Sequence, residues 1–133
     1  MTDITAVSSG DSNVAANWNP AQVPTSVDNT TIDGFTITVP SGVVFEPQHL
    51  TLRGSSDAAR GGIYAAGSYV ASGGLTLGQF NTLGMLPGGE IDIAGGAITA
   101  DSTETSTDTY NIIDFVGAIG NYWTLHDSIG GGS

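Results

Sequence analysis

The sequence contains no cysteine, and its only basic side chains besides two histidines are Arg53 and Arg60. The missing thiols exclude disulfide bonds and thiolate metal sites. Against the two arginines stand 13 acidic residues, which give a formal net charge of −11 at pH 7. Because nucleic acids and anionic lipids are bound through Lys and Arg, we expect no nucleic acid and no membrane as partners.

Long apolar runs are also missing. No stretch approaches the roughly 20 apolar residues that a membrane-spanning helix needs. Residues 1–20 lack the basic and apolar regions of an export signal. These observations predict a protein that is made in the cytoplasm and stays soluble.

The length of 133 residues fits one domain. With 20 glycines, 39% hydrophobic and 11% charged residues, the chain is too apolar for a disordered protein and too rich in glycine for a helical one. We predict a single compact domain over residues 9–128. Residues 1–8 form an N-terminal arm or a first strand, and residues 129–133 form a flexible Gly-rich tail.

Apolar residues alternate with threonine and other small polar residues in short runs, as at 36–39, 49–52 and 75–77. This period of two is typical of half-buried strands. The one candidate helical turn, at 12–18, is interpreted as a linker. We therefore predict an all-β fold with little or no helix, either a β-sandwich or jelly roll, or a short β-solenoid.

Asp33-Gly34 lies between two alternating runs. A two-residue turn there would place Ile32 opposite Phe35 and would gather the apolar side chains on one face. This consistency predicts a β-hairpin, and a solenoid corner is the alternative.

Four strand-like runs follow a Gly-Gly pair. Glycine adopts positive φ without steric cost, so each pair can reverse the chain in little space. The intervals between the pairs are uneven, and the pattern fits stacked solenoid coils and ordinary hairpins equally. The pairs are Gly61-Gly62, Gly73-Gly74, Gly88-Gly89 and Gly95-Gly96.

Residues able to support catalysis do not converge. His126-Asp127-Ser128 has the residue types of a hydrolase triad, but neighbours in an extended strand point in alternating directions. Among thirteen carboxylates, some pair will always lie at the distance that separates the acid and base of a glycosidase. Nothing specific in the sequence therefore supports Glu46, Asp57 or Glu90 as such a pair. We expect no enzyme, no catalytic residue and no cofactor.

The polar stretch Asp101–Asp108 is predicted to be a solvated loop. Calcium binding through Asp101, Glu104 and Asp108 is the alternative, although their spacing lacks the alternate acidic positions and the glycine of a known calcium loop. His49 and His126 have no third nitrogen or thiolate ligand near them in the sequence, so no metal site is expected.

Trp18 lies in the segment Asn17–Pro20. We interpret Trp18, with Pro20 and Pro24, as a plug that closes one end of the β structure. A carbohydrate-stacking platform is the alternative for Trp18. Trp123 is expected to plug the other end or to lie in a subunit contact.

The N-terminal third of the chain resembles the opening segment of Gly- and Thr-rich β-helical regions in large bacterial surface proteins and in small structural proteins of tailed bacteriophages. That segment often carries an aromatic residue directly after Gly-Asp, where this chain has Ser12. The resemblance rests on Gly10-Asp11, Asn17-Trp18-Asn19-Pro20, Val23-Pro24, Asp28, Thr31-Ile32-Asp33-Gly34 and Thr36-Ile37-Thr38-Val39.

The chain is similar in its gross properties to a phage head decoration, or cement, protein. This resemblance implies a homotrimer or dimer on the outer surface of the virion capsid, where it would bind the major capsid protein and bridge capsomers. Residues 2–7 would then add as a strand to the shell protein, unless they form the first strand of the domain's own sheet. A carbohydrate-binding or adhesin-type β module is the alternative function. The expected capsid or subunit interface consists of Thr2, Asp3, Ile4, Thr5, Ala6, Val7 and Trp123.

Overall fold

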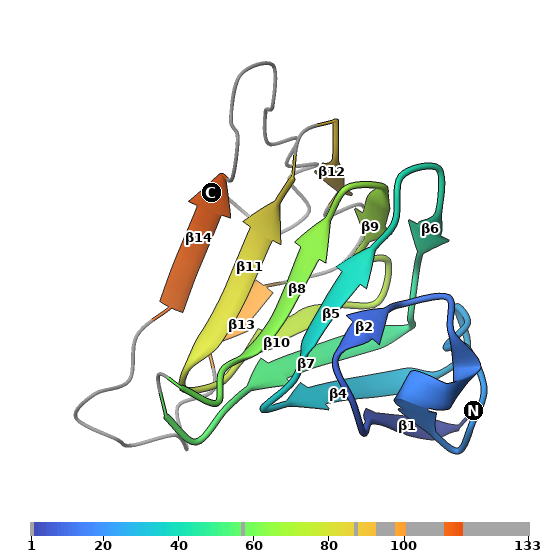
Figure 1. Ribbon diagram of the computed structural model, residues 1–133, viewed down its shortest axis with the longest axis horizontal. Helices are drawn as coiled ribbons and strands as arrows, with labels where there is room; N and C mark the ends of the chain where they lie inside the picture. The colour runs from blue at the N-terminus through green and yellow to red at the C-terminus, as the bar shows by residue number, and fades with distance from the viewer. Residues whose placement is uncertain (1, 57, 87, 93–97, 101–110, 116–133) are drawn as a thin grey trace.

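The strands stack into three sheets that run along the molecule side by side (Figure 1). The computed structural model describes residues 2–56, 58–86, 88–92, 98–100 and 111–115. Sheet A contains β1 (Asp3–Ala6), β3 (Trp18–Asn19), β4 (Asn29–Asp33), β7 (His49–Arg53), β10 (Leu75–Leu77) and β13 (Ile98–Ala100). Sheet B contains β2 (Gly10–Asp11), β5 (Thr36–Val39), β8 (Gly61–Ala65), β11 (Asn81–Met85) and β14 (Asn111–Phe115). Sheet C contains β6 (Val44–Phe45), β9 (Ser68–Val70) and β12 (Glu90–Asp92).

From β4 onward, successive strands of the chain enter sheets A, B and C in turn, so each circuit forms one coil of a short β-solenoid. The strand pairs of the three sheets are parallel except β1 with β3. The one helical turn among the described residues is a 3-10 turn, η1 (Ala15–Asn17). The prediction of an all-β fold is therefore confirmed, and of the two predicted architectures the chain adopts the solenoid.

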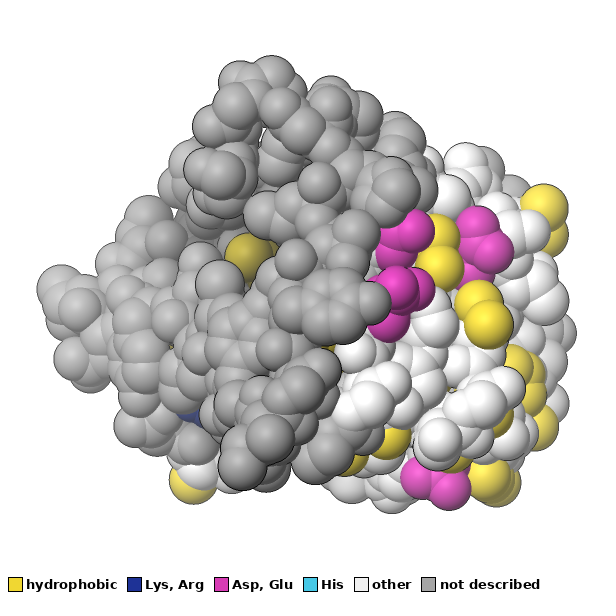
Figure 2. All heavy atoms as spheres, turned by 90° about the horizontal axis from the view of Figure 1, so that it is seen from above, with side chains coloured by type: hydrophobic (Ala, Val, Ile, Leu, Met, Phe, Trp, Pro, Cys, Tyr) yellow, Lys and Arg dark blue, Asp and Glu magenta, His cyan; other side chains and the backbone are white. Residues whose placement is uncertain are grey.

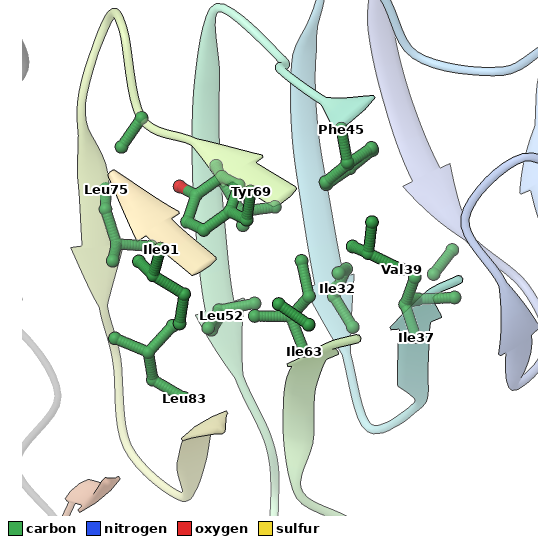
Figure 3. Close-up of a cluster of buried hydrophobic side chains, with 14 of the residues drawn as sticks. Ile32, Ile37, Val39, Phe45, Leu52, Ile63, Tyr69, Leu75, Leu83 and Ile91 are labelled. Atoms are coloured by element: carbon green, nitrogen blue, oxygen red, sulfur yellow. The ribbon is translucent and has the colours of Figure 1, made fainter. Parts of the chain in front are cut away.

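The register of the coils places like residues above one another. In sheet B, Ile37 of β5 pairs with Ile63 of β8, and β8 in turn pairs with β11, where Leu83 follows Ile63. In sheet C, Phe45 pairs with Tyr69. These side chains are buried, and Figure 3 shows them pointing inward from sheets B and C. Because side chains alternate along each short strand, every strand turns part of its side chains inward. Stacking the coils in register then aligns these inward side chains in columns.

The predicted hairpin at Asp33-Gly34 is wrong. β4 and β5 lie in different sheets, and Ile32 pairs with Leu52 of the next coil instead of Phe35. Gly34, at φ +81°, donates its N–H to the carbonyl oxygen of Arg53 at 3.0 Å. An isolated two-stranded hairpin would leave its apolar face open to water. The solenoid instead buries the apolar faces of β4 and β5 in one shared core.

Glycine at the start of β8 serves a purpose other than the predicted chain reversal. Gly61 belongs to the strand, and a Cβ built on it would lie 1.9 Å from the Arg53 oxygen and 2.4 Å from the Ile32 oxygen. Close approach between stacked coils therefore requires glycine here. Gly88, at φ +81°, does adopt the expected turn conformation, and Gly95-Gly96 lies outside the described residues.

The N-terminal strand is part of the chain's own sheet. β1 lies between β3 and β4, so both of its edges are paired. Ile4 and Ala6 are 1% and 3% exposed and pack in the core. Of the two predictions for residues 2–7, the first strand of the domain's own sheet is the one the structure shows, and the free arm is wrong, because β3 and β4 pair with the two sides of β1.

Candidate functional site

The corner where sheet B turns into sheet C carries a surface depression of about 360 Å³. Three successive coils contribute to it, each with the turn that precedes a strand of sheet C. Its lining consists of Ser41, Gly42, Val43, Val44, Ala66, Gly67, Ser68, Gly88 and Glu90. Because the depression crosses three coils, it follows the direction in which the coils stack.

Hydrogen bonds between the turns fix the shape of this corner. Val43 donates its N–H to the Pro40 oxygen at 3.0 Å, and the Val43 oxygen accepts from the Ser68 N–H at 2.9 Å. In the next coil the Gly67 oxygen accepts from the Glu90 N–H at 2.9 Å. A Cβ on Gly67 would lie 2.1 Å from the Pro40 oxygen, so a larger residue would separate the coils. The depression is therefore built into the stacked turns.

Its side chains combine apolar groups and serine hydroxyls with one carboxylate. Val44, Ser68 and Glu90 are partners in the register of sheet C, and each begins its strand. Val44 is 63% exposed, Glu90 is exposed and Ser68 is half-buried. In the view of Figure 2, acidic side chains lie next to hydrophobic ones on the surface formed by the described residues. This arrangement is able to contact an apolar group and to accept hydrogen bonds from a cation.

The outer face of sheet A carries a column of threonines in register. Thr5, Thr31, Thr51 and Thr76 occupy successive strands, and all are partly or fully exposed. His49, which looked isolated in the sequence, lies beside this column with a ring nitrogen 2.8 Å from the Thr76 hydroxyl oxygen.

A pair of opposite charges lies at the end of β4 and β7. Asp33 and Arg53 are register partners and form an ion pair that is partly exposed. Exposed pairs of this kind contribute about 0.2–1 kcal/mol to stability. The ion pair is thus a link between coils more than a binding group.

Trp18 lies at the N-terminal end of the core and is 2% exposed. Its indole N–H donates to the Ser12 oxygen at 3.0 Å, and its ring stacks on Phe45. A buried ring cannot stack on a sugar, so the interpretation of Trp18 as a carbohydrate platform is wrong. Of the two prolines grouped with it, Pro24 is buried and Pro20 is exposed after a cis peptide bond.

The predicted interface residues divide between the two sides of β1. Asp3, Thr5 and Val7 are exposed, whereas Ile4 and Ala6 face the core. Thr2 donates its backbone N–H to Asp28 Oδ1 at 3.2 Å. Several other candidates lie outside the described residues, namely Asp57, Asp101–Asp108, Trp123 and His126-Asp127-Ser128.

Asp28 is a buried carboxylate whose role the sequence reasoning did not identify. Its Oδ2 accepts from the Thr25 N–H and the Thr25 hydroxyl, both at 2.9 Å. The hydrogen bond from the Thr25 backbone, followed by the Thr25 hydroxyl and the Thr2 backbone, holds the pKa of Asp28 below its ordinary value against the opposing effect of burial. Asp28 therefore ties the first strand to the turn before β4.

The turns that line the depression were also missed as a site. Gly42, Gly67 and Gly88 were visible in the sequence, but each lies in a different coil.

Within the described ranges, no three His, Cys, Asp or Glu side chains are grouped so that they could hold a metal ion. No helix in the described part of the chain has the length and apolar character that crossing a membrane requires.

Comparisons of the chain with models of protein families, with curated proteins and with solved structures give no match. The likeness to β-helical surface proteins and phage structural proteins therefore stays a prediction from the residues of the N-terminal third.

Proposed function

We propose that the protein is a structural component of a tailed-phage virion, which binds the outer surface of the capsid as a homo-oligomer and stabilises it by bridging capsomers. The observation that carries the proposal is the solenoid itself. Its coils share one closely packed core, in which Ile37, Ile63 and Leu83 follow one another in register. A rigid body of this kind holds its surface residues at fixed separations.

Fixed separations favour multivalent binding. When one contact with the shell has formed, the next becomes intramolecular, so several weak contacts give a stable attachment. A preorganised body also loses less conformational freedom on binding than a flexible one. The net charge of −11 suits a position outside the shell, because it would repel packaged DNA.

Contact with the shell would use exposed side chains and not strand addition by β1. Both edges of β1 are occupied within sheet A. Its outward residues, Asp3 and Thr5, and the following Val7 stay exposed. Deleting residues 1–8 would remove Ile4 and Ala6 from the core and is therefore a poor test of binding.

The direct test is co-sedimentation with expanded capsids assembled from the major capsid protein encoded in the same genome. We expect saturable binding at a fixed ratio to capsid protein, and no binding to capsids of an unrelated shell protein. Protein that stays in the supernatant at every concentration would contradict the proposal.

A carbohydrate-binding module is the second candidate, and the depression at the corner of sheets B and C is the feature that favours it. Ser68 and Glu90 offer a hydroxyl and a carboxylate to sugar hydroxyls. Affinity electrophoresis in gels that contain neutral polysaccharides tests this candidate. Retardation by one polysaccharide, lost in Glu90→Gln, would favour it over the capsid.

A further inference from the structure

We infer that the depression at the corner of sheets B and C is a docking groove for an extended, basic segment of a partner protein. The inference rests on the proposed function and deepens it, since on a capsid that segment would belong to the shell protein. Three observations carry it: the shape of the depression, its exposed valine and its charge.

The shape suits a narrow ligand. A volume of about 360 Å³ is near the lower end of the range for ligand pockets. Gly42, Gly67 and Gly88 keep its surface free of side chains at one turn in each coil. Because the turns are joined by hydrogen bonds, the groove exists before any partner binds. Such a groove accommodates one or two side chains of an extended segment better than a bulky cofactor.

Val44 gives the groove an apolar end. It is 63% exposed and belongs to β6, which pairs with β9 on one edge and has no strand on its other edge among the described residues. Sheets A and B extend further at this end through β1, β3 and β2. A segment that runs along the groove, across the three coils, would therefore cover Val44 at the free edge of sheet C.

The charge of the groove selects the partner. Glu90 lies at the third coil and is exposed. The chain's own two arginines are engaged elsewhere: Arg53 pairs with Asp33, and Arg60 lies over the Phe80 ring and donates to the Asn81 oxygen at 2.7 Å. A basic side chain of a partner segment would complement this exposed carboxylate. A second copy of this chain, with its net charge of −11, is a poor source.

A neutral glycan fits the groove less well than a basic peptide. None of the nine lining residues is aromatic, although rings are the usual apolar surface for sugar binding. Val44 instead offers a branched aliphatic contact. The experiment therefore also tests whether a neutral polysaccharide displaces the basic peptide from the groove.

The experiment titrates the full chain with the capped pentapeptide Lys-Val-Lys-Val-Lys and monitors backbone amide shifts by NMR at low and moderate salt. We expect saturable shifts at residues 41–44, 66–68 and 88–90, and no comparable shifts with the Glu-Val-Glu-Val-Glu peptide. Glu90→Gln should weaken binding about two- to fivefold, as expected for an exposed ion pair. Val44→Ser should weaken it about threefold to tenfold through lost apolar contact.

Two variants serve as matched controls. Asp11→Asn removes the same charge from another exposed position, and Val27→Ser alters a valine that is 58% exposed. Both should bind the basic peptide as the parent does. Equal weakening by test and control variants, shifts spread over the whole surface, or displacement by a neutral polysaccharide instead of peptide binding would overturn the inference.

Co-sedimentation with capsids separates this inference from the proposed function. If the parent binds capsids and the double variant Glu90→Gln/Val44→Ser does not, while Asp11→Asn/Val27→Ser does, both are supported. If the groove variant still binds capsids fully, the groove assignment is wrong and the function stands. If the parent binds the peptide but no capsid, the proposed function is wrong and the basic-peptide chemistry of the groove is supported.

Discussion

The indole ring of Trp18 lies nearly parallel to the phenyl ring of Phe45, with ring centroids 5.9 Å apart and an interplanar angle of 15°. Phe45 in turn lies 6.1 Å from Tyr69 of the next coil. Three aromatic rings thus continue from the N-terminal segment into sheet C. Trp18 closes this end of the core, because it covers the Phe45 ring, which would otherwise meet water.

Removing this closure should destabilise the whole solenoid. Trp18→Ala deletes a fully buried aromatic side chain, and we expect a loss of about 3–5 kcal/mol in the free energy of unfolding. Trp18→Phe keeps a ring on Phe45 and should lose clearly less, although it forfeits the hydrogen bond to the Ser12 oxygen. Urea denaturation followed by far-UV circular dichroism measures both. Equal losses in the two variants would show that the stacking is unimportant.

Thr30 offers a stabilising substitution. Its side chain faces the core at 2% exposure, and its hydroxyl oxygen has no hydrogen-bond partner. Thr30→Val replaces this hydroxyl with a methyl group of similar size, and we expect a gain of about 1 kcal/mol in the free energy of unfolding. Thr31→Val, on the outer face of the same strand, is the control and should change little. A destabilised Thr30→Val protein would contradict the inward orientation of Thr30.

Asp28 should make stability depend on acid. Since its pKa is lower in the folded protein than its ordinary value of 3.8, its stabilising contribution is fully present above about pH 4. That contribution is lost as the pH falls through the folded pKa. Asp28→Asn should reduce stability at pH 7 and flatten the decline below about pH 4. Melting temperatures across this range, with exposed Asp11→Asn as control, test it; parallel curves for Asp28→Asn and the parent would refute the prediction.

Two glycines should respond differently to alanine. Gly61→Ala places a methyl group against the Arg53 oxygen of its own coil and the Ile32 oxygen of the preceding coil, and should cost about 3 kcal/mol or more. At Gly42, with φ +82°, a Cβ would meet no atom within 4 Å, so Gly42→Ala should cost only about 1–2 kcal/mol of backbone strain. Chemical denaturation compares them. A milder effect at Gly61 than at Gly42 would contradict the stacked register.

The strands and much of the core were predictable because both follow from alternation along the chain. Ile32 and Ile37 are inward-facing whether the chain forms a hairpin or a solenoid corner, so the pattern identified the buried face but not the pairing partner. Partner choice depends on contacts between coils, such as Ile32 with Leu52. These partners lie far apart in the chain, so a local sequence pattern does not identify them. The hairpin prediction failed for this reason.

The candidate groove was less predictable than the core. Gly42, Gly67 and Gly88 come together only when three turns of different coils are stacked. The choice between an arm and a first strand for residues 2–7 stayed open in the sequence for a related reason. β1 pairs with β3 and β4, which lie later in the chain, so the alternating run at 2–7 carried no sign that both edges would be paired.

The measurement that tests the proposed function most directly is the temperature at which expanded capsids break open, with and without bound protein. A protein that bridges capsomers should raise this temperature in step with its occupancy of the shell. Capsids that carry the protein at full occupancy and still break at the temperature of bare capsids would contradict the account.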